Sequence, residues 1–293
     1  MNYEGRVSLL LVGLHNSGKT HYGAQLLGRL RSGTGLLKMN GVATDLGAFE
    51  QAFADLAEGR LAAHSATESY TESLWPVVAD GGGQADLIWP DYGGEQVRQL
   101  YQGRQVGEGW LRRIRKSDGW LFLIRPHIVS QLQDVWERPH AAHAKPGTTS
   151  QEAPGVITEA LQWRDQAALV ELLQILLYSR RADLGKPLRD PALVVALTCW
   201  DEMTDEMQQL KPDEVLRKHL PMLASFLESN WAADRRSVYG ISALGKALQK
   251  DVPDEDFQNR GPAVQGWVIH PGGGGKDYDL TAPVARLIGM AKT

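Results

Sequence analysis

The feature that most constrains this chain is a glycine-rich turn at residues 13–20, Gly-Leu-His-Asn-Ser-Gly-Lys-Thr, which follows directly on the apolar stretch 7–12. The turn fits the pattern G-x-x-x-x-G-K-[ST], in which glycines let backbone N–H groups curl around phosphate oxygens. Residues 20–30 after it are typical of a helix, with Leu26, Leu27 and Leu30 on one face. A strand, a glycine turn and a helix in this order point the positive end of the helix at a phosphate. A nucleoside triphosphate is therefore the first ligand to consider.

Each residue of the turn has a predicted part in holding the nucleotide. Lys19 would span the β- and γ-phosphates, and Thr20 would place its hydroxyl on Mg²⁺. His15 either donates to the γ-phosphate or fills space, because the motif requires only its backbone. The predicted nucleotide contacts of this segment are Gly13, His15, Asn16, Ser17, Gly18, Lys19, Thr20 and His21.

Apolar, strand-like runs recur along the chain, and helix-like segments lie between most of them. Such alternation predicts an α/β fold with a mostly parallel central sheet covered by helices on both faces. Gly103, Gly107 and Gly109 should break the helix expected around them. We expect strands at 6–13, 73–79, 85–90, 119–125, 192–199 and 236–241, and helices at 47–60, 95–116, 159–182, 212–230 and 282–291.

We expect a single domain over residues 1–293, with an insertion loop at about 137–155 and a C-terminal extension at about 250–293. A net charge of −4 and a pI near 6.1 make neither nucleic acid nor an anionic membrane an obligatory partner. No run approaches the roughly 18 apolar residues of a transmembrane segment. The single cysteine, Cys199, suits a reducing cytosol, so the predicted compartment is the cytoplasm.

A second phosphate-sensing motif is predicted at residues 91–95, Asp-Tyr-Gly-Gly-Glu, at the end of the strand 85–90. An aspartate at the carboxyl end of a strand can hold Mg²⁺ through water. Gly94, three residues after Asp91, can offer its backbone N–H to the γ-phosphate without obstruction by a side chain. The alternative is a plain turn before a helix whose N-terminus favours Glu95.

Two further strand ends are candidates for reading a base, because open α/β sheets bind ligands outside the carboxyl ends of their strands. Residues 198–201, Thr-Cys-Trp-Asp, follow the strand 192–199, and Ser242, Ala243 and Leu244 follow the strand 236–241.

Together these motifs resemble the Ras-like (TRAFAC) division of P-loop GTPases, whose motifs run in the order phosphate loop, D-x-x-G, [NT]-K-x-D and S-A-[KL]. The resemblance spans residues 6–245 and implies that the chain binds GTP and GDP with Mg²⁺. It implies that Asp201 accepts hydrogen bonds from guanine N1 and its 2-amino group, that Thr198 braces the loop, and that the Ala243 N–H meets guanine O6. Trp200 is interpreted as standing in the place of the lysine of [NT]-K-x-D, where its indole would stack on the base. Its alternative is a partly buried aromatic residue near a strand end.

More narrowly, the chain resembles bacterial double-GTPase-type proteins, in which a long first switch contains a helix before the second strand. Residues 47–60 fit that helix. The resemblance implies a switch threonine that coordinates Mg²⁺, which we place at Thr67 in preference to Thr71, with Thr44 as the next choice. All three could equally be solvated loop residues.

Hydrolysis in this family uses a glutamine directly after D-x-x-G, and here that place holds Glu95, with Gln96 next. The predicted catalytic residues are therefore Lys19, Glu95 and Gln96. A carboxylate beside the γ-phosphate is electrostatically unfavourable, so we expect slow turnover. A partner could supply an arginine, and the internal candidates are Arg60, Arg98 and Arg104.

The resulting hypothesis is an Mg²⁺-dependent GTP-binding switch with weak hydrolysis that acts on an effector or regulatory protein through segments 61–72 and 92–116. The family resemblance alone implies a bacterial conflict or signalling system. One alternative is a nucleotide-dependent scaffold that does not hydrolyse its ligand. Another is a P-loop kinase or ATPase with an arginine-rich lid at residues 112–116.

Overall fold

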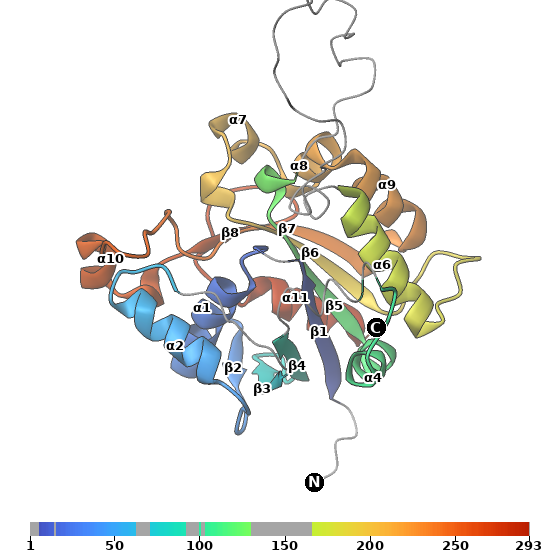
Figure 1. Ribbon diagram of the computed structural model, residues 1–293, viewed down its shortest axis with the longest axis horizontal. Helices are drawn as coiled ribbons and strands as arrows, with labels where there is room; N and C mark the ends of the chain where they lie inside the picture. The colour runs from blue at the N-terminus through green and yellow to red at the C-terminus, as the bar shows by residue number, and fades with distance from the viewer. Residues whose placement is uncertain are drawn as a thin grey trace, which may run out of the picture.

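The computed structural model describes residues 6–14, 16–62, 71–91, 100, 103–129 and 166–292, with the backbone alone at 71, 90 and 91. These residues form one eight-stranded sheet in the order β2-β3-β4-β1-β5-β6-β7-β8 (Figure 1). The strands are β1 (Val7–Gly13), β2 (Leu37–Met39), β3 (Thr71–Ala79), β4 (Gln84–Asp91), β5 (Gly119–Ile124), β6 (Ala192–Thr198), β7 (Arg236–Ser242) and β8 (Trp267–Ile269).

The centre of the sheet is parallel. Strands β4, β1, β5, β6 and β7 run in one direction, whereas β3 pairs antiparallel with both β2 and β4, and β8 pairs antiparallel with β7. The predicted α/β fold with a mostly parallel sheet is confirmed, and all six predicted strands are present. The sequence did not indicate β2 and β8, because their three residues each are too few to show a periodicity.

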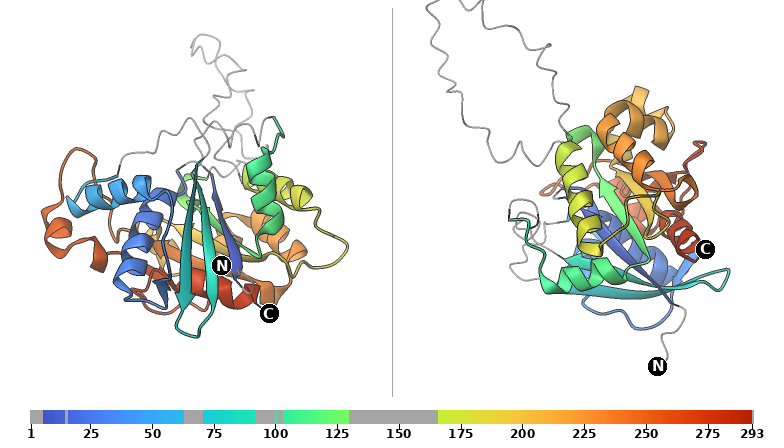
Figure 2. Two further views of the ribbon diagram at one scale, coloured as in Figure 1. Left: turned by 90° about the horizontal axis from the view of Figure 1, so that it is seen from below. Right: turned by 90° about the vertical axis from the view of Figure 1, so that its right-hand side faces the viewer.

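Helices cover both faces of the sheet (Figures 1 and 2). Helices α4, α6, α8 and α9 pack on one face, while α1 and α11 pack on the other and α2 lies against α1. The helices are α1 (Lys19–Ser32), α2 (Gly47–Ala57), α4 (Glu108–Lys116), α6 (Gln166–Arg180), α7 (Asp205–Gln208), α8 (Pro212–His219), α9 (Pro221–Asn230), α10 (Glu255–Arg260) and α11 (Ala282–Ala291).

The sequence of β1 shows why the sheet is covered twice. Leu10 and Val12 belong to the apolar cluster beneath α4, α6, α8 and α9, whereas Leu9 and Leu11 belong to the cluster beneath α1 and α11. Successive side chains of a strand point to opposite faces, so a strand that is buried on both faces needs apolar residues at nearly every position. The near-continuous apolar run at 7–12 follows from that requirement.

Two predicted helices differ from the observed ones. The helix predicted at 212–230 is divided into α8 and α9, because Pro221 is the first residue of α9 and offers no N–H to continue α8. In the segment predicted at 95–116, residues 103–107 are not helical and α4 begins only at Glu108, as the glycines at 103 and 107 led us to expect. The predicted insertion loop at 137–155 lies outside the described residues.

The C-terminal segment completes this sheet and its core. Strand β8 forms one edge of the sheet, and α11 packs against β5 and β6. Leu280 and Leu287 are completely buried there. Across the described ranges, none of the helices combines the length and the apolar character needed to cross a bilayer.

Candidate functional site

The predicted motifs gather at one edge of the sheet. The loop 13–20 follows β1, Asp91 ends β4, Thr198 ends β6 and Ser242 ends β7. These strands are parallel, so their carboxyl ends meet at the same edge. Open α/β sheets bind ligands at such an edge, which makes it the candidate site.

The backbone of the glycine-rich loop folds back on itself. A Cβ added at Gly13 would lie 2.5 Å from Ser17 Oγ and 2.8 Å from the carbonyl oxygen of Leu123, so only glycine fits there. Asn16 and Gly18 have φ angles of 60° and 77°, in the left-handed region. The amide of Ser17 donates to the carbonyl of Leu14 at 3.3 Å, which closes the turn. The resulting concave backbone is the shape that surrounds a phosphate in other glycine-rich loops.

The helix after the loop starts without a side-chain cap. Gly18 is the N-cap of α1, and the first turn of the helix contains no acidic residue. The ammonium of Lys19 lies back across the loop, where its Nζ donates to the carbonyls of Gly13 at 2.9 Å and Leu14 at 2.7 Å. A helix N-terminus beside a cation attracts an anion. Thr20 and His21 continue this first turn and are half-buried.

For Asp91 and Thr71 the structure describes the backbone alone. The register of β1 with β4 pairs Leu10 with Ile88, and its continuation for three residues brings Asp91 level with Gly13. Thr71 lies directly opposite Asp91 on β3. His15, Thr67, Gly94, Glu95 and Gln96, all predicted site residues, lie outside the described residues.

Thr44, the remaining candidate for the switch threonine, is held in another role. Its backbone amide donates to the carbonyl of Leu74 at 3.0 Å, and its hydroxyl accepts a hydrogen bond from the Leu74 amide at 3.3 Å. Leu74 is three residues from Thr71 along β3, a separation of about 10 Å. Thr71 therefore has its backbone nearer to Asp91 than Thr44 does.

Thr198 joins the end of β6 to the glycine-rich loop. Its hydroxyl oxygen lies 2.9 Å from the carbonyl oxygen of Ser17 and 3.0 Å from that of Ile124, and its single proton is donated to one of them at a time. The side chain is buried and also lies against Gly18, whose added Cβ would be 3.4 Å from Thr198 Cβ. A buried side-chain hydrogen bond therefore joins Thr198 to the glycine-rich loop.

The assignment of Trp200 to the lysine place of [NT]-K-x-D is wrong. Counting from Thr198 to Asp201 puts Cys199 second and Trp200 third, and the Cys199 Sγ lies beside Gly18. Burial raises the pKa of the Cys199 thiol to about 12, so the thiol is protonated at neutral pH. The spacing of [NT]-K-x-D in the sequence was enough to place Cys199 at the lysine position.

The predicted stacking of Trp200 on a base is also wrong. Its indole is completely buried in the core cluster on the α4, α6, α8 and α9 face. It packs against Gly240 of β7, where an added Cβ would lie 2.4 Å from the indole Cε3. A fully buried ring offers no face to a ligand. The glycine inside the strand 236–241 was the available signal, because a glycine in a strand often marks a close approach.

Asp201 lies on a loop that is fixed from several sides. The amide nitrogen of the Gln208 side chain donates to the carbonyls of Met203 at 2.8 Å and Asp201 at 3.3 Å. Trp200, the residue before Asp201, is completely buried and so anchors the loop. Within the described part of the chain, the half-buried carboxylate of Asp201 itself has no hydrogen-bond or ion-pair partner.

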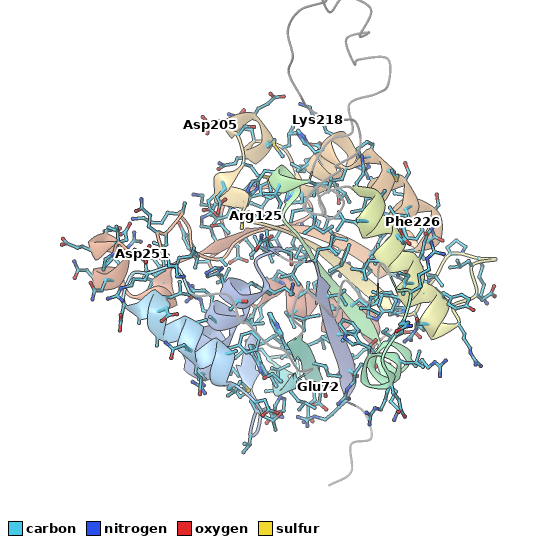
Figure 3. All side chains as sticks on the ribbon, in the orientation of Figure 1. Glu72, Arg125, Asp205, Lys218, Phe226 and Asp251 are labelled. Atoms are coloured by element: carbon cyan, nitrogen blue, oxygen red, sulfur yellow. The ribbon has the colours of Figure 1, made fainter. Side chains whose placement is uncertain are left out.

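An ion-paired cluster that the sequence did not indicate holds the next residue, Glu202. Its carboxylate pairs with Arg125, the residue after β5, and lies 3.2 Å from His127 Nε2. Hydrogen bonds from His127 and Arg125 lower the pKa of the Glu202 carboxyl to about 2. Figure 3 shows Arg125 near the upper end of the sheet, at the edge that carries the motifs. The cluster ties the loop of Asp201 to β5.

The loop after β7 is turned by its own serine. Ser242 Oγ accepts a hydrogen bond from the Gly245 amide at 2.8 Å, so the chain turns sharply after β7. The side chain of Leu244 is buried in a small apolar cluster with Leu248 and Phe257, so Leu244 has only its backbone available for a ligand. Ala243, between Ser242 and Leu244 in the chain, is half-buried.

The donor set at this edge is compatible with Mg²⁺. Over the residues that the structure describes, there is no group of three or more His, Cys, Asp or Glu side chains that could hold a metal by itself. Mg²⁺ is usually held by one or two protein ligands together with phosphate oxygens and water. Thr20 and Asp91, both predicted from the sequence as Mg²⁺ ligands, belong to α1 and to the end of β4, which meet at this edge.

Comparison with known proteins gives a family and a set of structural neighbours. The model of a family described as Double-GTPase 1 matches residues 10–287. A search of the curated proteins found no match. The signal recognition particle receptor SRb-GTP/SRX complex from Chaetomium thermophilum aligns at 13% identity with a TM-score of 0.39, over 84% of this chain and 95% of that chain. The S. cerevisiae Ski7 GTPase-like domain, bound to GDP and inorganic phosphate, aligns at 14% identity with a TM-score of 0.42, over 81% of this chain and 43% of that chain.

Proposed function

The chain belongs to the Double-GTPase 1 family, and from this premise we propose that it is an Mg²⁺-dependent GTP-binding switch with slow GTP hydrolysis that acts on a protein partner. The observation that carries the proposal is the 2.9 Å contact between the Thr198 hydroxyl and the carbonyl of Ser17. This contact fixes the loop of Asp201 against the phosphate loop. A nucleotide that lies across the two loops would meet a phosphate cradle at one end and a carboxylate at the other.

The phosphate end rests on the loop 13–20. Backbone N–H groups of the loop and of the α1 N-terminus would surround the phosphates, and Lys19 would exchange its contacts with the Gly13 and Leu14 carbonyls for contacts with the β- and γ-phosphates. An ammonium held at 2.7–2.9 Å from two loop carbonyls is already at the mouth of the cradle. His15 would lie beside the γ-phosphate.

The base end rests on Asp201 and Ala243. The Asp201 carboxylate would accept hydrogen bonds from guanine N1 and its 2-amino group, and the backbone N–H of Ala243 would donate to guanine O6. Adenine has an acceptor at N1 and a donor at its 6-amino group, so both contacts would be lost or repulsive. A carboxylate without a partner among the described residues, on a loop fixed by Gln208 and Glu202, supports this role.

Mg²⁺ would be held by Thr20 and Asp91, with a threonine of the first switch as a further ligand. Thr67 remains the proposed residue for that third position, and the backbone of Thr71 opposite Asp91 makes Thr71 its alternative. Mg²⁺ bound there would neutralise charge on the β- and γ-phosphate oxygens.

Hydrolysis would be slow. Lys19 and the backbone N–H groups of the loop would stabilise charge as a water attacks the γ-phosphate in line. Glu95 and Gln96 would orient that water, and the negative charge of Glu95 beside the γ-phosphate opposes the reaction. A non-hydrolysing scaffold differs from this proposal by turnover alone, and a P-loop ATPase differs by base preference.

The proposed partner is a protein that contacts segments 61–72 and 92–116. A bidentate ion pair joins these segments, because Arg113 of α4 donates through Nε to Glu72 of β3 at 2.8 Å and through Nη2 to its other carboxylate oxygen. Glu72 directly follows Thr71, so a nucleotide-dependent change at the metal site would reach α4 through this pair. Signalling or defence in bacteria is the proposed setting, on the family resemblance alone.

The experiment that tests the function is calorimetric binding of GTP, GDP, ATP and ADP with Mg²⁺. The parent protein should bind guanine nucleotides selectively. Lys19→Ala should lose binding of both guanine and adenine nucleotides, and Asp201→Ala should lose the preference for guanine nucleotides. Asp183→Ala and Lys186→Ala, at exposed positions in the segment before β6 and so at the opposite end of the sheet from the loops, are the matched controls and should bind as the parent does. Equal or adenine-preferring binding that ignores Asp201 would contradict the assignment. Phosphate release then separates slow hydrolysis from the scaffold alternative.

A further inference from the structure

Gly266, just before β8, packs backbone to backbone on the base-reading loop. A Cβ added there would lie 2.3 Å from the carbonyl oxygen of Ala243 and 2.8 Å from that of Ser242. The φ angle of Gly266 is +80°, a conformation that strains any other residue. The peptide before Gly266 therefore forms a wall directly behind Ala243, and any side chain at 266 must displace that residue.

A buried arginine on α1 holds this wall in place. Arg29 is 4% exposed, and its Nη2 donates to the carbonyl oxygen of Gln265 at 2.6 Å. Burial lowers the pKa of the guanidinium, with Asp279 acting in the opposite direction. Taking a cation out of water is costly unless its hydrogen bonds compensate. The buried guanidinium of Arg29 thus holds the carbonyl of Gln265, the residue before Gly266, and with it the peptide that touches Ala243.

We propose that Gly266 and Arg29 determine base specificity by positioning the backbone N–H of Ala243. The inference rests on the proposed function, in which that N–H donates to guanine O6. The path runs from Arg29 through the Gln265 carbonyl to Gly266 and then to the peptide of Ala243. A displacement of Ala243 weakens the contact with guanine O6, and it leaves the phosphate cradle on the opposite side of the base unchanged. The two residues act through Ala243 and touch no nucleotide themselves.

The readout is the ratio of GDP affinity to ADP affinity, because a general loss of stability lowers both affinities together. Gly266→Ala should lower this ratio about tenfold, the effect expected when one hydrogen bond to the base is lost. Gly261→Ala is the matched control. Gly261 has a φ angle of 76°, nearly that of Gly266, but an added Cβ there meets nothing within 4 Å. Both variants place an alanine at a φ angle near +80°, and only the first puts its Cβ against the backbone of Ala243.

A second pair tests the arginine. Arg29→Met keeps an unbranched apolar stem in the buried position and removes the donor to Gln265, so it should lower the same ratio. Arg31→Met makes the same change two residues further along α1, at a half-exposed ion pair with Glu50, and should leave the ratio unchanged. Thermal unfolding establishes which variants are folded before their affinities are compared.

The outcomes separate the two proposals. A parent protein without guanine preference removes the proposed function and this inference with it. A selective parent whose Gly266→Ala and Arg29→Met variants keep the parental ratio overturns the positioning role alone. If Gly266→Ala does not fold, Arg29→Met decides the question. If neither folds, the two residues hold the domain as a whole and the specificity role is wrong.

Discussion

Replacing Thr198 by valine removes a buried hydrogen bond between the end of β6 and the phosphate loop. Thr198 is 3% exposed, and its hydroxyl oxygen lies 2.9 Å from the carbonyl of Ser17 and 3.0 Å from that of Ile124. Valine keeps the branched shape and replaces the hydroxyl by a methyl group. Two buried carbonyl oxygens then lose the single proton that they share.

The expected cost follows from that geometry. A net hydrogen bond contributes about 1 kcal/mol, and a buried acceptor left without a partner costs about 1–3 kcal/mol. One proton serves two carbonyls, so we expect a loss near 2 kcal/mol, or a Tm lower by roughly 4–8 °C for a domain of this size. GDP affinity should fall about tenfold in addition, because the loop of Asp201 is no longer held against the cradle.

Thermal unfolding and calorimetric binding of GDP measure the two effects on the same samples. Thr198→Ser is the matched control, since it keeps the hydroxyl and should retain affinity within about threefold of the parent. A Thr198→Val protein that loses stability but binds GDP as tightly as the parent would refute the reasoning. The contact would then serve the fold, with no part in presenting Asp201 to a ligand.

Three further predictions concern the surroundings of the site. Gly240→Ala should destabilise the protein by roughly 1–3 kcal/mol in urea unfolding, since its Cβ would lie 2.4 Å from the Trp200 indole, and a smaller side chain at 200 should recover part of the loss. Hydrogen bonds from a histidine and an arginine lower the pKa of the Glu202 carboxyl to about 2, so its stabilisation is present above the usual pKa and is lost as pH falls through about 2. Glu202→Gln should therefore show a shallower loss of stability at acidic pH, and an unchanged slope would contradict this. Arg113→Ala should speed amide hydrogen exchange in α4, because the arginine anchors that helix to Glu72, and unchanged exchange would show that other contacts suffice.

The fold was predictable because its strands are continuous apolar runs between glycine-rich or polar turns. In β6, all seven residues are buried, and such a run needs no knowledge of distant contacts to be recognised. Edge strands β2 and β8 escaped prediction because each has only three residues and takes its conformation from a neighbouring strand. The division at Pro221 is a local signal that the apolar periodicity of 212–230 concealed.

The site was predictable as far as its motifs are local. The turn at 13–20 closes through contacts within a few residues, and Thr198 reaches Ser17 because β1 and β6 end at the same edge of the sheet. The burial of Trp200 could not be predicted locally. It depends on Gly240, which follows Trp200 by forty residues and belongs to β7.

The same reasoning explains why the motifs alone underestimate how much of the chain shapes the candidate base-reading edge. Each of its two loops packs against a glycine that belongs to another segment of the chain. Gly240 makes room for Trp200 beneath the loop of Asp201, and Gly266 makes room for the peptide of Ala243. Neither glycine lies in a recognisable motif, yet a single methyl group at either would move a loop that carries one. Positions 240 and 266 should therefore tolerate substitution as poorly as Gly13, where an added Cβ meets Ser17 at 2.5 Å.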